Sequence, residues 1–149
     1  MKIAALLSGG VDSSVALSLL RSEGHDVTAF YLKVWLEDEL SHLGTCPWEE
    51  DLRFAREVCR LLDVPLEVRS LQRPYWDRVV RYAIGELEAG RTPSPDVLCN
   101  QHIKFGAFLD EIDPGFERVA SGHYARRDDA SGRTLLKRGA DPVKDQTYF

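Results

Sequence analysis

The sequence predicts an α/β fold of the Rossmann-like class, a mostly parallel sheet with helices on both faces. Three observations predict it. Buried strands and amphipathic helices alternate along the chain, and the first strand leads through a glycine-rich turn into a helix. The second strand follows so soon that it should lie parallel to the first. With 149 residues, the chain has the length of one domain.

The first half of the chain alternates strands with two helices. We expect strands at 2–7, 26–34 and 65–68, where apolar, β-branched and aromatic residues dominate. The first helix should end before Gly24, and its apolar positions recur every four residues: Val11, Val15 and Leu19. The second helix, at 48–62, has an apolar face made of Phe54, Ala55, Val58, Leu61 and Leu62.

The second half continues this pattern and then changes it. A third helix ends at Gly90 and is marked by Trp76, Val79, Val80, Ala83, Ile84 and Leu87. Two prolines make 91–96 a loop, and a helical pattern returns at 98–111. A further buried strand is expected at 116–120. A polar turn between 124–126 and 134–136 then predicts a hairpin.

Composition and charge exclude several classes of protein. The chain is 44% hydrophobic and 29% charged, and no apolar run approaches the roughly 20 residues that cross a bilayer. The apolar start stops at Ser8, too early for a signal peptide. A net charge of −5 argues against non-specific nucleic-acid binding, although residues 121–149 are net basic. The three cysteines fit free thiols in a reducing compartment. We therefore expect a cytoplasmic protein without membrane contact.

The junction between the first strand and the first helix, SGGVDSS at residues 8–14, predicts a phosphate site. Its glycines let the backbone approach a ligand, the helix N-terminus offers free N–H groups, and the serine hydroxyls add donors. It lacks the lysine of a Walker A loop, which disfavours γ-phosphoryl transfer. Asp12 would repel phosphate unless a cation lay between them, so it is a candidate Mg²⁺ ligand. The alternative is a tight turn in which Asp12 and Ser13 only cap the helix.

A second segment, residues 90–106, places a carboxylate and a thiol together. Asp96 lies three residues before Cys99 at the start of a predicted helix, where the helix dipole lowers the pKa of a thiol. Asp96 could cap that helix or take a proton. The alternative is structural, with Cys99 a small buried residue and Asp96 a simple N-cap.

These segments resemble a known family. SGGVDSS is similar to the SGGxDSS signature of the PP-loop ATP pyrophosphatases, which cleave ATP between its α and β phosphates. GRTPSPDVLCN and IKFGAFL look like the catalytic segment of the tRNA 2-thiouridylases of the MnmA family, and residues 75–77, 121–126 and 141–149 are similar too. The matches follow the family order from residue 3 to residue 149. The resemblance implies an adenine nucleotide alpha hydrolase-like fold and a PP-loop catalytic domain at 1–149.

The resemblance also implies an activity and residue roles. The activity is an ATP-dependent sulfurtransferase, which with Mg²⁺ adenylates the C2 oxygen of the tRNA wobble uridine and replaces that oxygen with sulfur. The implied partners are tRNA and a sulfur-donor protein, either a cysteine desulfurase or a relay protein.

The resemblance also assigns roles to residues. Cys99 would be the nucleophile and Asp96 the acid-base residue. ATP would be held by Leu7, Ser8, Gly9, Gly10, Val11, Asp12, Ser13, Ser14, Leu32 and Gly122. The target uracil would meet Ser94, Pro95 and Asp96, and tRNA would meet Lys144, Asp145 and Gln146.

The chain departs from the family pattern in two places. Ser94 stands where the family usually has Asn, and because its side chain is shorter, its implied contact with the target uracil is the least secure of the implied roles. The family's second cysteine, which resolves the intermediate as a disulfide, and its central and C-terminal domains are not found in these residues. Cys46, expected in a loop, and Cys59, expected in the core, do not match that cysteine. We therefore expect a truncated chain that does not complete thiolation alone.

Two other functions stay open at this point. A non-catalytic ATP-binding module, like stress-protein domains of similar architecture, explains the glycine-rich loop but leaves GRTPSPDVLCN without a role. An amidotransferase-type synthetase with the same loop has no need of Cys99 and requires a glutamine-hydrolysing partner.

Overall fold

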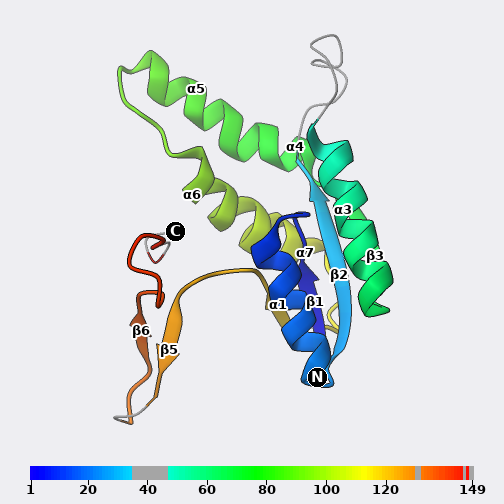
Figure 1. The fold of residues 1–149 in the computed structure, drawn as a ribbon. Helices are drawn as coiled ribbons and strands as arrows, with labels where there is room; N and C mark the ends of the chain where they lie inside the picture. The colour runs from blue at the N-terminus through cyan, green and yellow to red at the C-terminus, as the bar shows by residue number, and fades with distance from the viewer. Residues whose placement is uncertain (35–46, 130–131, 146, 148–149) are drawn as a thin grey trace.

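A four-stranded parallel sheet organises the protein. The computed structural model describes residues 1–34, 47–129, 132–145 and 147. The strands are β1 (Lys2–Leu6), β2 (Asp26–Lys33), β3 (Leu66–Ser70) and β4 (Arg118–Ala120), in the order β3-β2-β1-β4 (Figure 1). Every pairing in this sheet is parallel. The predicted Rossmann-like class, including the parallel second strand, is confirmed.

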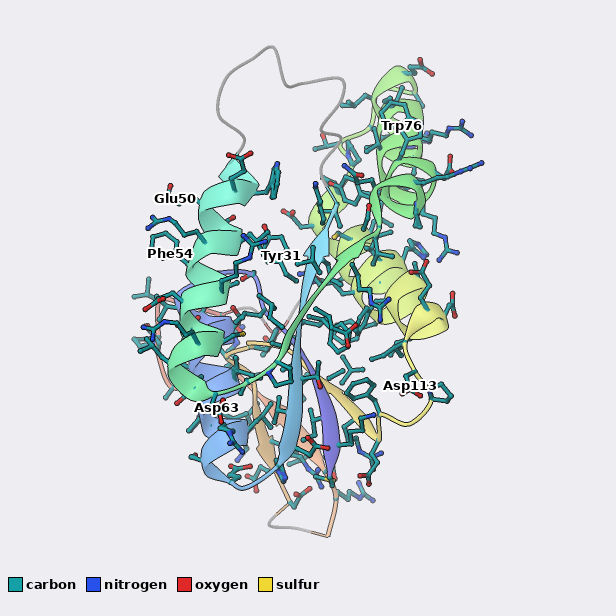
Figure 2. The ribbon with its side chains drawn as sticks, turned by 90° about the vertical axis from the view of Figure 1, so that its right-hand side faces the viewer. Tyr31, Glu50, Phe54, Asp63, Trp76 and Asp113 are labelled. Carbon is teal, nitrogen blue, oxygen red and sulfur yellow. The ribbon has the colours of Figure 1, made fainter. Side chains whose placement is uncertain are left out.

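Helices cover both faces of the sheet. The helices in the described residues are α1 (Val11–Ser22), α3 (Pro47–Leu62), α4 (Gln72–Tyr75), η2 (Trp76–Val80), α5 (Arg81–Glu88), α6 (Pro95–Cys99), η3 (Asn100–Ala107) and α7 (Phe108–Glu111). Figure 2 shows α3 on one side of the strands and the continuous run from α6 to α7 on the other. The hairpin of β5 (Arg126–Asp128) and β6 (Leu135–Lys137) is antiparallel, as predicted, and stands away from the sheet (Figure 1).

The alternation of side chains along the strands builds two cores. Ala5 and Leu7 face the cluster formed with α1 and α3. Ala4 and Leu6 face the opposite cluster, where Phe30 meets the ring of Phe108 edge to face, 5.1 Å between centroids. Because successive strand residues point to opposite faces, a continuous apolar strand supplies both cores at once.

The buried face of α1 differs from the apolar stripe that predicted the helix. Val11, Val15 and Leu19 are 77%, 51% and 57% exposed, whereas Leu17 is fully buried and Ser13 is buried beside the loop. The face that packs on the sheet therefore includes a polar position. The spacing of apolar residues alone therefore does not predict which face of α1 is buried.

The apolar face expected for α3 is also partly wrong. Leu52, Ala55 and Cys59 form its buried face, with Val58 and Leu62 packed against the same cluster. Phe54 and Leu61 are exposed, and Phe54 points away from the sheet in Figure 2. The expected core position of Cys59 is confirmed.

Two helical runs contain wide turns with hydrogen bonds to the fifth preceding residue. The backbone N–H of Arg81 bonds to the carbonyl of Trp76 at the end of η2, and that of Phe108 bonds to Ile103 at the end of η3. Such π-helical turns are uncommon and are frequent at functional sites. The second of them lies directly after Cys99.

Among the described residues, the structure contains no helix with both the length and the apolar character needed to cross a membrane.

Candidate functional site

The candidate site lies at the carboxyl ends of β1 and β4. The chain places β2 and β3 on one side of β1 and β4 on the other, so the strand order reverses between β1 and β4. Open parallel sheets bind ligands in the crevice outside such a reversal. The loop after β1 holds SGGVDSS, and the loop after β4 holds Ser121 and Gly122.

A cavity of about 310 Å³ occupies this position. It is lined by Leu6, Leu7, Ser8, Asp12, Ser13, Phe30, Tyr31, Leu32, Val34, Asp51, Cys99, Lys104, Ser121 and Gly122. Six of the expected ATP-binding residues are therefore brought together with Cys99. The other four, Gly9, Gly10, Val11 and Ser14, shape the loop beside the cavity and are not among its lining residues. These assignments stay predictions.

The hydroxyl of Ser13 forms hydrogen bonds within the SGGVDSS loop. It accepts a hydrogen bond from the backbone N–H of Ser8 at 3.2 Å and donates to the carbonyl of Gly10 at 3.0 Å. The hydroxyl of Ser14 donates to the same carbonyl at 2.9 Å. Gly10, the N-cap residue of α1, makes no side-chain cap bond to the first N–H groups of the helix, which leaves these groups available to an anion.

Two glycines allow backbones to meet around the loop. Gly9 has φ 82°, and a Cβ there would strike the backbone carbonyl of Asp51 in α3. At Gly122 a Cβ would come within 2.6 Å of the carbonyl carbon of Asp12 and the backbone nitrogen of Ser13. The loops after β1 and β4 and the start of α3 are thus packed backbone to backbone, and side chains at these glycines would separate them.

Asp12 meets a cation of the protein itself. Tyr124 donates its hydroxyl to one carboxylate oxygen at 2.8 Å, and the Lys144 ammonium reaches the other at 3.0 Å while lying 4.4 Å from the centre of the Tyr124 ring. The Tyr124 hydrogen bond, followed by Lys144, holds the pKa of Asp12 below its usual range. The positive charge that we expected beside Asp12 is therefore provided, in this structure, by Lys144 of the C-terminal segment.

The donor set fits a Mg²⁺ ion that is shared with a nucleotide. Mg²⁺ is commonly held by one or two carboxylates together with substrate phosphates and waters. Asp12 and Asp51 both line the cavity. In the described part of the chain, no three His, Cys, Asp or Glu residues gather into a protein-only metal site. The ion would therefore depend on the phosphates for its remaining ligands.

Cys99 faces the cavity, but its thiol is not activated as expected. Burial raises its pKa, Lys104 lowers it, and Asp96 raises it further. The expected lowering by a helix start is wrong, because the helix begins at Pro95 and Cys99 is the last residue of α6. The helix dipole acts mainly within the first turn, so burial outweighs it.

Asp96 does not cap the helix. Ser94 occupies the cap position, without a side-chain cap bond, and Asp96 lies exposed in the first turn. The alternative role of a simple N-cap is therefore excluded. Ser94, Pro95 and Asp96, the expected uracil contacts, form the exposed start of α6 and are not among the cavity lining. Their roles stay predictions.

The expected tRNA contacts are engaged within the chain. Lys144 pairs with Asp12. Asp145 accepts hydrogen bonds from the backbone and hydroxyl of Thr147 and lies 3.1 Å from Arg138. Gln146 lies outside the described residues, as does Cys46. The tRNA contacts of Lys144, Asp145 and Gln146 stay predictions.

Sequence reasoning missed three chemical groups at the cavity. Tyr31 donates its hydroxyl to the carbonyl of Trp48 and lies between β2 and α3 (Figure 2). Asp51 comes from α3, and Lys104 from η3. Only Lys104 carried a usable signal, since it lies in the IKFGAFL motif. Lys104 also lines an adjoining cavity of about 580 Å³ with Asn100 and His123.

A family model described as the tRNA methyl transferase HUP domain matches residues 1–149. The chain belongs to this family. Two relatives described as tRNA-specific 2-thiouridylase MnmA agree with it. The protein of Parabacteroides distasonis is 45% identical over 149 residues, covering 100% of this chain and 41% of the relative. That of Akkermansia muciniphila is 50% identical over 144 residues, covering 96% and 40%. The resemblance read from the motifs is confirmed.

The chain spans about 40% of the length of these curated relatives. Among solved structures, a predicted subunit of tRNA methyltransferase from Methanocaldococcus jannaschii superposes with a TM-score of 0.56 at 21% identity, covering 89% of this chain and 57% of that one. At this identity the likeness supports the fold alone.

Proposed function

We propose that residues 1–149 bind ATP at the SGGVDSS loop and form the ATP-using part of a tRNA 2-thiouridylase. The observation that carries the proposal is that one cavity holds the phosphate loop and the Cys99 thiol. A non-catalytic ATP-binding module gives no reason for a cysteine at that place. An amidotransferase-type synthetase gives none either. Thiolation, the activity for which the 2-thiouridylase relatives are named, requires a nucleotide and a nucleophilic sulfur in one site.

The reaction has two chemical demands. The C2 oxygen of uracil is a poor leaving group, so it first attacks the α-phosphorus of ATP, and the bond from that phosphorus to the bridging oxygen of pyrophosphate breaks. The N–H groups at the start of α1 and the hydroxyl of Ser8 would stabilise the negative charge on the phosphates. Mg²⁺ held at Asp12 would add positive charge there.

The second step replaces the activated oxygen. The outer sulfur of a persulfide on Cys99, supplied by a sulfur-donor protein, attacks C2, and AMP leaves with the oxygen. A second thiol then attacks the Cys99 sulfur, forming a disulfide and leaving the transferred sulfur on C2. Asp96, exposed beside Cys99 on α6, is the candidate to exchange the proton of the uracil.

Calorimetry with a non-hydrolysable ATP analogue and Mg²⁺ tests the nucleotide part. Ser13→Ala removes the hydroxyl that links Ser8 to Gly10, and we expect roughly a tenfold loss of affinity, the size of one or two hydrogen bonds. Asp12→Ala should weaken binding only when Mg²⁺ is present. The matched control is Ser18→Ala, an exposed serine on the same helix. Equal affinity in Ser13→Ala and Ser18→Ala would place the nucleotide elsewhere.

The thiolation part has its own test. Unmodified tRNA is incubated with ATP labelled in the α-phosphate, and transfer of label to the tRNA is followed on gels. Cys99→Ala should still form the adenylated tRNA, since the thiol acts after activation. Loss of labelling in Cys99→Ala, with ATP affinity unchanged, would contradict the order of steps.

A further inference from the structure

The anionic form of the Cys99 sulfur needs a positive partner, because burial and the nearby carboxylate of Asp96 both disfavour it. Cys99 packs against the second core, beside Tyr75, and is half-buried. The charged and titratable groups around it are Tyr75 from α4, Asp96 on its own helix and Lys104 from η3, with Asp12, Tyr31 and Asp51 across the cavity. Three of these are carboxylates, which disfavour a sulfur anion. Lys104 is the cation among the described cavity-lining residues.

The π-helical turn explains how Lys104 reaches this place. In a regular α-helix, residues five apart are separated by about 140° around the axis and do not share a face. Lys104 is the fifth residue after Cys99, and η3 takes hydrogen bonds to the fifth preceding residue. The wider turn brings positions 99 and 104 onto one side, and both line the cavity.

The charge of Lys104 is oriented but not neutralised. Its ammonium donates to the amide oxygen of Asn100 at 2.8 Å. Among the residues that the structure describes, no carboxylate forms an ion pair with it. An oriented ammonium held by a neutral amide keeps its attraction for an anion.

We propose that Lys104, held by Asn100, is the positioning residue that stabilises the anionic form of the Cys99 sulfur and directs it at the SGGVDSS loop. Its purpose rests on the proposed function, because sulfur transfer needs an anionic sulfur near the nucleotide. The electrostatic effect of Lys104 on the thiol exists without substrate, so it can be tested separately. The opposing effects of burial and Lys104 on the pKa of Cys99 agree with this assignment.

The experiment measures alkylation of the 149-residue chain by iodoacetamide across pH 6–11, with the Cys99 peptide quantified by mass spectrometry. Lys104→Met should move the pH midpoint of the Cys99 rate upward by about one unit, as expected when a nearby cation is lost. Lys104→Arg should restore most of the shift. Asn100→Leu, which leaves the ammonium without its anchor, should give an intermediate midpoint. Lys137→Met, on the exposed hairpin, is the matched control and should match the wild type.

Two controls keep the outcome interpretable. Cys59 is buried, and burial raises its pKa to about 11, so resistance of Cys59 to alkylation reports that a variant is folded. The affinity for the ATP analogue is measured in the same variants. A Cys99 midpoint that is equal in the wild type and in folded Lys104→Met overturns the inference, even where the variant loses ATP affinity. Failure of the proposed function would appear in Ser13→Ala and leave the Cys99 midpoints unaffected.

Discussion

Gly122→Ala tests whether the loop after β4 packs closely against the SGGVDSS loop. The added methyl would lie 2.6 Å from the backbone nitrogen of Ser13 and from the carbonyl carbon of Asp12, and 2.8 Å from the Asp12 carbonyl oxygen. Contact at ordinary van der Waals distance would require the two loops to separate by about 0.8 Å. The obstacle is backbone on the far side, so no side-chain rotation relieves it.

The magnitude follows from overpacking. Forcing an extra carbon into a packed contact costs about 1–3 kcal/mol, which for a domain of this length lowers Tm by roughly 3–10 °C. The affinity for the ATP analogue should fall by at least about tenfold, because the displaced Ser13 nitrogen belongs to the start of α1, where we propose that the phosphates bind. Thermal unfolding followed by circular dichroism and calorimetry with the analogue measure the two effects.

The matched control is Gly85→Ala. Gly85 lies exposed within α5, and a Cβ there meets nothing within 4 Å. Alanine favours a helix over glycine by about 1 kcal/mol, so this variant should be as stable as the wild type or more stable, with unchanged affinity. If Gly122→Ala keeps both the Tm and the affinity of the wild type, the close approach of the two loops is refuted.

Two further predictions concern the core and Asp12. Phe108→Ala should lower the free energy of unfolding by about 3–5 kcal/mol in urea titrations, because Phe108 is 1% exposed and packs on Phe30. The control is Leu109→Ala at the neighbouring exposed position, which should lower it by less than about 1 kcal/mol. Similar losses in both variants would contradict this packing. Tyr124→Phe removes the hydrogen bond that chiefly lowers the pKa of Asp12 and keeps the ring beneath Lys144. Since the folded-state pKa of Asp12 is depressed, the stabilisation from this bond is complete above its unfolded pKa of about 3.9 and is lost as pH falls through the lower folded value. The stability difference between wild type and Tyr124→Phe should therefore be full at pH 7 and shrink toward pH 3 in denaturant titrations, and a difference independent of pH would show that Asp12 is not the partner.

The order of the elements and their type could be predicted from local patterns in the sequence. Apolar strands, helical periods and glycine stops are local signals, and Gly24 and Gly90 do take the positive φ values that end α1 and α5. The SGGVDSS loop was predicted as a phosphate site because a strand, a flexible backbone and a helix start follow one another directly there. Boundaries shifted by small amounts, as at β3, where the strand runs to Ser70 instead of Val68.

The contacts between distant side chains, and the effects of their charges on pKa values, depend on the tertiary structure. Asp12 takes its partners from positions 124 and 144, more than 100 residues away, and no local pattern contains that information. Ser13 lies on the buried face of α1 because its hydroxyl completes the loop, so an apolar count selected the wrong stripe. The protonation of Cys99 depends on the core behind it and on Lys104 reached through a π-helical turn. The burial of a group and the charges around it depend on residues that are brought together only when the chain folds.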